Sequence, residues 1–267
     1  MSWRNNRPLK PFERAFLGIL LAVSLYVAAS LWGVVAGGLP HLGRALADGE
    51  IRFAVGLSLW TTTLSTALCL LLGIPCAYLL ACTRLPGRRW VQALLELPLS
   101  LPCLVLGLCL LTLFSSPVGK ALREMGLRVV FDPKGIVAVH LLLNLPFVIH
   151  LAAQAFAQID PELPLTAQTL GASRFQAFRY ITLPLCRPAL LSAALLAWSR
   201  GMGEFGATLM LVGVTRLKTE TLPASIYLNI STGDNGMALA AALLLLLLSL
   251  AVQGVSRLAE KLGGDLS

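Results

Sequence analysis

Long apolar runs separated by short polar segments dominate the pattern of this chain. Six runs reach the roughly 20 residues that a helix needs to cross a bilayer. Because their apolar residues are continuous and do not alternate with polar ones, they predict helices and exclude the strands of a membrane barrel. The expected spans are Ala15–Ala36, Phe53–Ala81, Leu94–Phe114, Gly135–Gln158, Ala189–Val212 and Met237–Ser256.

Three of these spans have features that predict irregular geometry. The second is long enough to tilt or to extend beyond the hydrocarbon. Pro98 and Pro102 remove backbone donors near the start of the third span and should bend it, and Pro146 predicts a kink in the fourth. Kinked helices are common where a bundle encloses a path, although many kinks are only structural.

The composition agrees with a membrane protein. Of 267 residues, 57% are hydrophobic and only 13% are charged, whereas about a quarter of a soluble domain is charged. We therefore expect an all-α, polytopic membrane protein with about six transmembrane helices, forming one domain over residues 1–267. None of the six cysteines belongs to a C-x-x-C pair, so we interpret them as small buried hydrophobic residues with no disulfide or metal framework.

Basic residues at the N-terminus and between the spans set the predicted topology. Residues 1–14 are basic and precede an uncharged run, 15–36, that is longer than the 7–15 residues of a signal-peptide core, so we interpret it as a retained first span. The net charge of +8 is spread between spans and forms no single patch, which argues against nucleic-acid binding. We predict that both termini and the segment 160–188 are cytoplasmic.

The topology rests on counting Lys and Arg between the spans, because cytoplasmic loops carry more of them. Twelve lie on the predicted inner side: Arg4, Arg7, Lys10, Arg14, Arg84, Arg88, Arg89, Arg174, Arg179, Arg187, Arg257 and Lys261. Eight lie on the predicted outer side: Arg44, Arg52, Lys120, Arg123, Arg128, Lys134, Arg216 and Lys218.

The polar segment Asp160–Pro188 has readable local signals. Asp160 followed by Pro161 predicts a helix start, and Gly171 predicts the end of that helix after Leu170. Ser173 and Gln176 fit a capping box for a second short helix, which we expect to end before Pro184. From these signals alone, an ordinary amphipathic connector between spans remains an open alternative.

The stretch GASRFQAFRYITLP also resembles the cytoplasmic signature of ATP-binding-cassette importer permeases, an EAA triplet followed by glycine and later by I-x-L-P. The sequence departs from the family at the triplet, where leucine replaces the glutamate, and Glu162 one turn earlier is a candidate substitute. The resemblance implies that this helix pair docks in a cleft of a cytoplasmic ATPase subunit. The residues that it assigns to coupling are Glu162, Leu165, Thr166, Ala167, Gly171, Ala172, Ser173, Ile181, Leu183 and Pro184.

A second resemblance narrows the branch. LAWSRGMGEFGATLMLVG, KTETLPASIY and STGD look like the molybdate, tungstate and sulfate permeases. The R-x-x-GEFGA core is shared with sulfate permeases, whereas TLP-x-x-IY and the six-span length look closer to molybdate or tungstate permeases. The likeness implies a core permease module over residues 53–258 that forms the path of an ATP-driven oxyanion importer, with a sulfate or thiosulfate permease as the alternative.

Further expectations follow from the resemblance. The chain would be a non-catalytic subunit that binds no cofactor, because ATP and Mg would be held by cytoplasmic ATPase partners. An extracytoplasmic oxyanion-binding protein, a second permease copy forming a homodimer and the lipid bilayer are the other implied partners. The implied location is the cytoplasmic membrane of a prokaryote.

Two charged residues lie inside the fifth span. Arg200 and Glu204 are four apart, so on one helix they share a face and can pair. Charges at membrane depth often mark a pathway, but a structural pair near the outer end of the span remains open. Nearby glycines permit close helix approach or a local break. The candidate path or gate residues are Arg200, Gly203, Glu204, Phe205, Gly206 and Thr208.

The sequence offers little support for two other function classes. A secondary transporter would be expected to have more ionisable residues at mid-membrane and internal repeats. An intramembrane enzyme needs a nucleophile with a base or two acids, and neither is evident. His140 and His150 lie too far apart on one predicted helix to share a metal, which favours a core or boundary role.

Overall fold

Helices make up all the regular structure in the part of the chain that the computed structural model describes, residues 10–264. Side chains are described for residue 10 and for residues 12–254. Residues 1–9 of the predicted cytoplasmic segment 1–14 therefore lie outside the described residues, as do the side chains of Arg257 and Lys261. The all-α expectation is confirmed.

Four helices are long and apolar enough to cross a membrane, and they match four of the predicted spans. They are α1 (Pro11–Gly38), α3 (Gly49–Cys82), α7 (Pro133–Ala157) and α14 (Asn235–Gly264). Two further pairs of helices meet the same test only as bent spans, which gives up to six crossings among the described residues.

The third predicted span is not one straight helix. It divides into α4 (Arg88–Ser100) and α5 (Cys103–Ser115), which meet at an angle of 115°. Leu101 and Pro102 are extended at the break, because a proline disfavours helical geometry in the residue before it. Pro98, in contrast, is accommodated inside α4. The bend was expected, but it falls at Pro102 and is far sharper than a kink.

The fifth predicted span is also interrupted. It consists of α11 (Arg187–Met202) and α12 (Gly206–Val212), with a non-helical segment between them. Short helices that the apolar runs did not predict fill the connections: η1 (Leu39–His41), α2 (Leu42–Ala47), α6 (Pro117–Glu124) and α13 (Leu222–Ser231). With 10 residues or fewer each, they are too short to give a spanning signal.

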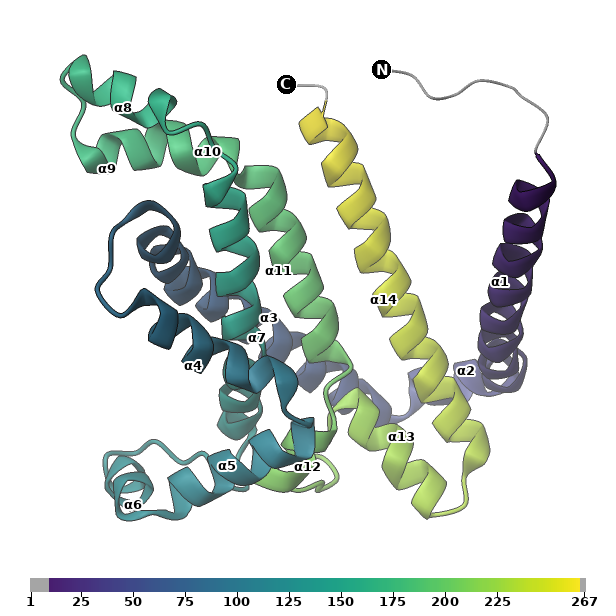
Figure 1. The fold of residues 1–267 in the computed structure, drawn as a ribbon. Helices are drawn as coiled ribbons and strands as arrows, with labels where there is room; N and C mark the ends of the chain where they lie inside the picture. Colours follow the sequence, from purple (N-terminus) through teal and green to yellow (C-terminus); the bar gives the residue numbers. More distant parts are fainter. Residues whose placement is uncertain (1–9, 265–267) are drawn as a thin grey trace.

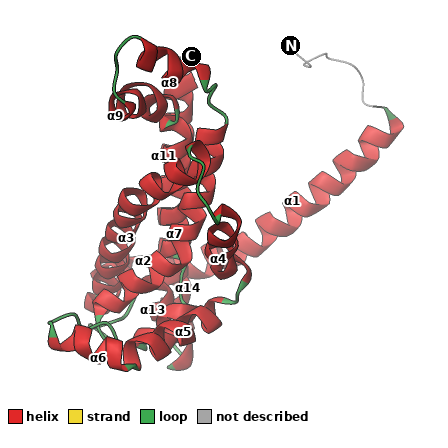
Figure 2. Cartoon of the chain, turned by 60° about the vertical axis from the view of Figure 1, so that its left-hand side comes forward, coloured by secondary structure: helices red, strands yellow, loops and turns green. Residues whose placement is uncertain are grey.

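The two ends of the bundle differ in what they carry. The segment between α7 and α11 lies at the same end as the start of α1 and the end of α14 (Figure 1). We call this the loop end. The opposite end carries α2, α5, α6 and α13 (Figures 1 and 2). This arrangement is the one expected for an even number of crossings.

Helices α3 and α7 pack along their lengths at the centre of the bundle, and α11 lies against both (Figure 1). Buried apolar side chains from these helices form one cluster at the loop end and another at mid-bundle. Helix α1, by comparison, is exposed along most of its length and packs against α14. At their crossing, a Cβ on Gly38 would lie 2.5 Å from the carbonyl oxygen of Leu239, so only glycine fits there.

Candidate functional site

The segment between α7 and α11 folds as the predicted helix, tight turn and helix. Helix α8 spans Glu162–Thr169, and the Asp160 carboxylate accepts a hydrogen bond from the Glu162 N–H at 3.0 Å. The chain then turns at Gly171, whose φ of +96° lies in the region that favours glycine. The Gly171 N–H donates to Gln168 and the Ala172 N–H donates to Ala167, which is the Schellman arrangement. The predicted end of the first helix is confirmed.

The second helix begins as predicted but does not end as predicted. Helix α9 spans Arg174–Ala177, and Ser173 and Gln176 cap it reciprocally, with hydrogen bonds of 2.7 and 3.2 Å. The chain stays helical past Pro184, however, as a π-helical stretch η2 (Phe178–Thr182) followed by α10 (Leu183–Leu185). Pro184 is tolerated because it lies in the first turn of α10, where a backbone donor is not required.

Aromatic side chains fasten this segment to the loop end of the bundle. The ring centroid of Phe178 lies 4.7 Å from that of Tyr78 on α3 and 6.2 Å from that of Phe156 on α7. Ala177 and Cys186 are buried beside them. The segment is therefore held through η2 by the ends of α3 and α7, and its second half continues through a 69° bend at Cys186 into α11.

The residues assigned to coupling fall into two groups in the structure. Ala167, Ala172, Ile181, Leu183 and Pro184 are half-buried, and Leu183 packs against the cluster at the loop end. Glu162, Leu165, Thr166, Gly171 and Ser173 are exposed. The exposed residues are thus available to a partner, whereas the I-x-L-P part of the signature packs toward the bundle.

Large apolar side chains on the same segment are open to solvent. Leu170 is 84% exposed, Phe175 is 68% exposed and Tyr180 is 70% exposed. Leu165 is 57% exposed and borders a cavity of about 840 Å³ that Arg84 and Arg174 also line. Large apolar side chains exposed on a polar loop favour an interaction site.

The helix interruption lies at the predicted gate segment. Helix α11 ends at Met202, and the chain is non-helical at Glu204 and Phe205 before α12 begins at Gly206. The Glu204 carboxylate accepts a hydrogen bond from the Ala207 N–H at 2.8 Å and so caps α12. Of the two alternatives that the nearby glycines left open, the local break is present at this point.

The single helix that would let Arg200 pair with Glu204 is not formed, so the structural pair that the sequence left open is contradicted. Because the helix ends between them, they do not share a face, and no ion pair joins them. The Arg200 guanidinium instead lies 4.8 Å from the ring centroid of Phe147 on α7. Arg200 is exposed and Glu204 is half-buried, so both remain accessible charges in an otherwise apolar region.

The other candidate gate residues surround the break. Phe205 stacks on Tyr227 of α13 with ring centroids 5.3 Å apart. Gly206 faces the start of α5, where an added Cβ would lie 3.6 Å from Cys103. Gly203 is exposed, whereas Thr208 is buried on α12. Elements α5, α12 and α13 therefore meet at the interruption.

Behind the break lies a buried polar cluster that the sequence analysis did not single out. Ser65 on α3 hydrogen-bonds to Nδ1 of His140 on α7 at 3.2 Å, and Asn144 donates to the carbonyl oxygen of Ala197 on α11 at 3.2 Å. A Cβ on Gly201 would lie 3.0 Å from the Thr62 side chain. The available signal was the spacing of small polar residues along one face of α3, which a hydropathy window averages away.

The two histidines of α7 differ in burial. His140 is buried at 2% exposure in this cluster, as a core role requires, whereas His150 is exposed and contacts Gln154 at 2.9 Å. Among the described residues, no group of three or more His, Cys, Asp or Glu side chains is placed to hold a metal ion.

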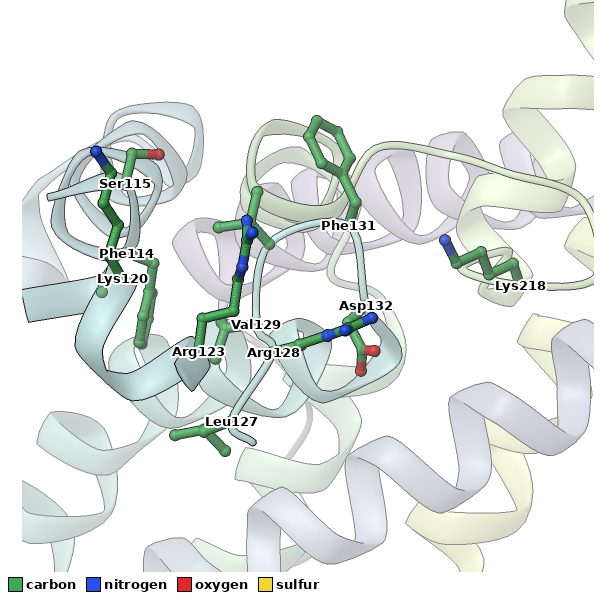
Figure 3. A pocket seen from close by; sticks show the side chains of 12 residues that line it. Phe114, Ser115, Lys120, Arg123, Leu127, Arg128, Val129, Phe131, Asp132 and Lys218 are labelled. Atoms are coloured by element: carbon green, nitrogen blue, oxygen red, sulfur yellow. The ribbon is translucent and has the colours of Figure 1, made fainter. Parts of the chain in front are cut away.

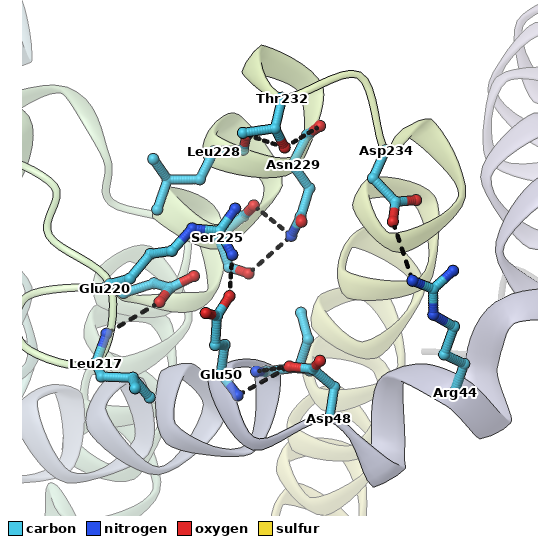
Figure 4. A network of polar contacts seen from close by, with 12 residues as sticks. Arg44, Asp48, Glu50, Leu217, Glu220, Ser225, Leu228, Asn229, Thr232 and Asp234 are labelled. Atoms are coloured by element: carbon cyan, nitrogen blue, oxygen red, sulfur yellow. Dashed lines mark hydrogen bonds and ion pairs between the residues drawn. The ribbon is translucent and has the colours of Figure 1, made fainter.

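Polar contacts fasten the opposite end (Figure 4). Arg44 pairs with Asp234 at 3.5 Å and Arg216 pairs with Glu50. Glu220 is fully buried and accepts a hydrogen bond from the Leu217 N–H at 3.2 Å. Because Leu217 has a φ of +56°, which is unfavourable for leucine, this bond helps to hold the strained loop between α12 and α13.

Comparison with known proteins agrees with this arrangement. Residues 71–262 match the family model described as binding-protein-dependent transport system inner membrane component. The chain is 35% identical over 202 residues to the molybdate/tungstate transport system permease protein WtpB of Thermococcus kodakarensis, covering 76% of this chain and 74% of that one. It is 36% identical over 180 residues to the sulfate transport system permease protein CysT of Salmonella typhimurium, covering 67% and 65%.

Among solved structures, the fold is similar to a chain of a bacterial alginate ABC transporter in complex with a pentasaccharide-bound periplasmic protein. The TM-score is 0.76, with 96% of this chain and 94% of that chain covered. Sequence identity is 17%, so this likeness supports the fold alone.

Proposed function

We propose that this chain transports a tetrahedral oxyanion. The chain belongs to the family of binding-protein-dependent transport system inner membrane components and is a multi-pass permease subunit of an ATP-binding-cassette importer. Molybdate or tungstate is the preferred substrate, and sulfate or thiosulfate is the alternative. The family assignment favours an ATP-driven importer over the secondary transporter and the intramembrane enzyme.

The observation that supports the mechanism best is that the chain is continuous from the exposed loop to the interrupted helix. The segment 160–188 presents exposed apolar side chains and runs through α10 into α11. Sixteen residues later α11 ends at the break before α12. A partner that moves α8 and α9 would therefore move the base of the helix that ends at the gate segment.

This mechanism places the loop end in the cytoplasm, with both termini on that side. The ATPase subunit would dock on α8 and α9, with Leu165, Thr166, Gly171 and Ser173 at the contact. Leucine at the position of the family's glutamate supplies apolar area there, and the exposed Glu162 supplies the carboxylate. ATP and Mg would be bound by that partner, because this chain's role is to form the path and transmit movement.

The path would run along the gate segment. Arg200, Gly203, Glu204, Phe205, Gly206 and Thr208 are the proposed path or gate residues. A second copy of this chain would supply the other half of the path, and an extracytoplasmic binding protein would deliver the oxyanion. Nucleotide drives this cycle only if ATP favours one of the two arrangements of the helices.

The choice of substrate rests on the relatives. A molybdate/tungstate permease protein and a sulfate permease protein match at nearly the same identity, 35% and 36%. The molybdate/tungstate match covers more of both chains, 76% and 74% against 67% and 65%. That broader match, together with the T-L-P-x-x-I-Y sequence of residues 221–227, favours molybdate or tungstate.

The test is substrate-stimulated ATP hydrolysis by the complex reconstituted in lipid nanodiscs. The permease is copurified with its cognate ATPase and mixed with the cognate binding protein loaded with molybdate, tungstate or sulfate. Stimulation by molybdate or tungstate and not by sulfate supports the proposal, whereas the reverse order supports the sulfate permease. Failure to associate with any ATPase would refute the importer mechanism.

A further inference from the structure

A basic cavity of about 610 Å³ lies at the end of the bundle opposite the coupling loop. Figure 3 shows Arg123 and Arg128 between Lys120 on one side and Lys218 on the other. These four side chains come from α6, from the segment after it and from the loop between α12 and α13. Asp132 is the one acidic residue in the lining, so the formal charge of the lining is 4 − 1 = +3.

Tight packing at Gly119 and a turn at Gly126 fix the backbone around the cavity. Gly119 of α6 packs so tightly on the backbone of Phe114 that no Cβ fits, which folds α6 back over the end of α5. Lys120 and Arg123 are three apart on α6 and so lie on neighbouring positions of its surface. Helix α6 then ends in a Schellman turn at Gly126, whose φ is +91°.

The segment after α6 is anchored to the gate helix. Val129 is buried against the end of α12, and the Phe131 N–H donates to the carbonyl oxygen of Leu211 at 3.5 Å. Phe131 has a φ of +56°, an unfavourable conformation that persists only where surrounding contacts impose it. Arg128 is therefore carried on a fixed segment next to α12.

Ion pairs among the described residues leave the positive charge of the cavity without a partner. In the described part of the chain, none of Lys120, Arg123, Arg128 and Lys218 forms an ion pair. Asp132, the acidic residue nearby, accepts a hydrogen bond from the Lys134 N–H at 3.0 Å and caps α7. Its carboxylate is therefore partly engaged by the backbone.

The position of these charges is unusual for a membrane protein. Lys and Arg are normally depleted from extracytoplasmic loops, yet the proposed topology puts four of them around one outer cavity. Guanidinium groups present paired donors that match the oxygens of a tetrahedral oxyanion, and ammonium groups add compact positive charge. This set of donors is chemically suited to bind an anion.

We propose that this cavity binds a tetrahedral oxyanion at the outer end of the permease, beside the helix that begins at the gate segment. The assignment to the outer end rests on the proposed function. The transported dianion and the phosphate of a phospholipid headgroup share this chemistry and are the two sources that the experiment separates. Bound there, the dianion occupies a collection point next to α12.

The experiment is equilibrium binding of radiolabelled molybdate and sulfate to the nucleotide-free permease–ATPase complex in phosphatidylcholine nanodiscs. Arg123→Gln/Arg128→Gln removes two charges and should weaken dianion binding by about tenfold or more. Lys120→Gln/Lys218→Gln tests the same cavity from two other elements, should the first pair reduce expression. Lys134→Gln, an exposed residue of the same end that does not line the cavity, is the matched control and should change affinity less than twofold.

Measuring the anionic phospholipid that copurifies with each variant shows whether the ligand is a lipid headgroup or the transported dianion. If anionic phospholipid copurifies with the wild type and is lost from Arg123→Gln/Arg128→Gln, the oxyanion site stands and its ligand is a headgroup. Equal dianion binding and equal lipid content in both cavity variants and the wild type would overturn the proposal. Unchanged binding of both anions with weaker docking of the binding protein would also overturn it, in favour of an acidic protein surface.

The anion site and the proposed transport function can fail independently of each other. If the cavity binds molybdate but molybdate does not stimulate ATP hydrolysis, the proposed function fails and the anion site stands. If molybdate stimulates hydrolysis equally in the wild type and both cavity variants and none of them binds a dianion or an anionic lipid at the cavity, the anion site fails and the proposed function stands.

Discussion

Gly171 is the single residue whose backbone conformation shapes the proposed coupling element. Its φ of +96° reverses the chain between α8 and α9, and an added Cβ would meet no atom within 4 Å. Substitution by alanine therefore introduces no collision. The only cost is the backbone conformation, which makes Gly171→Ala a clean test of whether the shape of this turn matters for ATPase docking.

The expected loss of ATPase affinity in Gly171→Ala follows from the cost of the backbone conformation at this residue. An L-residue in the left-handed region costs roughly 1–2 kcal/mol. If the turn relaxes in the free permease, docking must restore the strained geometry and loses that amount of free energy. A loss of one to two kcal/mol corresponds to about a 5- to 30-fold weaker affinity of the ATPase subunit.

Gly233 provides a closely matched control at the other end of the bundle. It ends α13 in the same Schellman arrangement, with a φ of +84°, and its Cβ would also meet no atom within 4 Å. Gly233→Ala should cost a similar amount of stability but leave ATPase affinity unchanged. The assay is biolayer interferometry of the purified ATPase subunit on permease immobilised in nanodiscs, with thermal melting of each variant alongside.

Two results would refute this reasoning. Wild-type affinity in Gly171→Ala would mean that the turn does not shape the docking surface. Equal loss of affinity in Gly171→Ala and Gly233→Ala would mean that general destabilisation, and not the coupling turn, weakens association.

The buried cluster and the gate cap give two further predictions. Gly201→Ala places a Cβ 3.0 Å from the side chain of Thr62 and should destabilise the permease by about 1–3 kcal/mol, read as a lower melting temperature. Gly203→Ala is the control, because the atom nearest to its Cβ would be 3.9 Å away, and it should melt like the wild type. Equal melting temperatures of the two variants would contradict the packing argument. Glu204→Ala removes the acceptor for the Ala207 N–H and should cost about 1 kcal/mol, while Glu204→Gln keeps an acceptor and should cost less. Equal stability of the two Glu204 variants would show that the carboxylate does not cap α12.

The long helices and the two short helices of segment 160–188 could be predicted from the sequence because both depend on local signals. A run of apolar residues is sufficient to predict α7 or α14, and the Asp160, Gly171 and Ser173 signals predict caps from residues within one turn of each other. These features need no knowledge of distant contacts. Pro184 misled the prediction because the first turn of α10 tolerates a proline that a helix interior would not.

The end point of α11 and the two polar sites could not be predicted in the same way. Whether Arg200 and Glu204 pair depends on where α11 ends, and the break at Gly203 is supported by contacts with α5 and α13 from elsewhere in the chain. The basic cavity joins α6 with a loop almost 100 residues later. Such sites arise from tertiary packing, which a single sequence does not report.

In the proposed function, this chain couples ATP hydrolysis by its partner to oxyanion import. The most direct measurement is accumulation of labelled molybdate in proteoliposomes that contain the permease and its ATPase, with the binding protein outside and ATP inside. We predict uptake against a concentration gradient that requires ATP and the binding protein and falls in Gly171→Ala but not in Gly233→Ala. Uptake that proceeds without ATP along an imposed ion gradient would contradict the account.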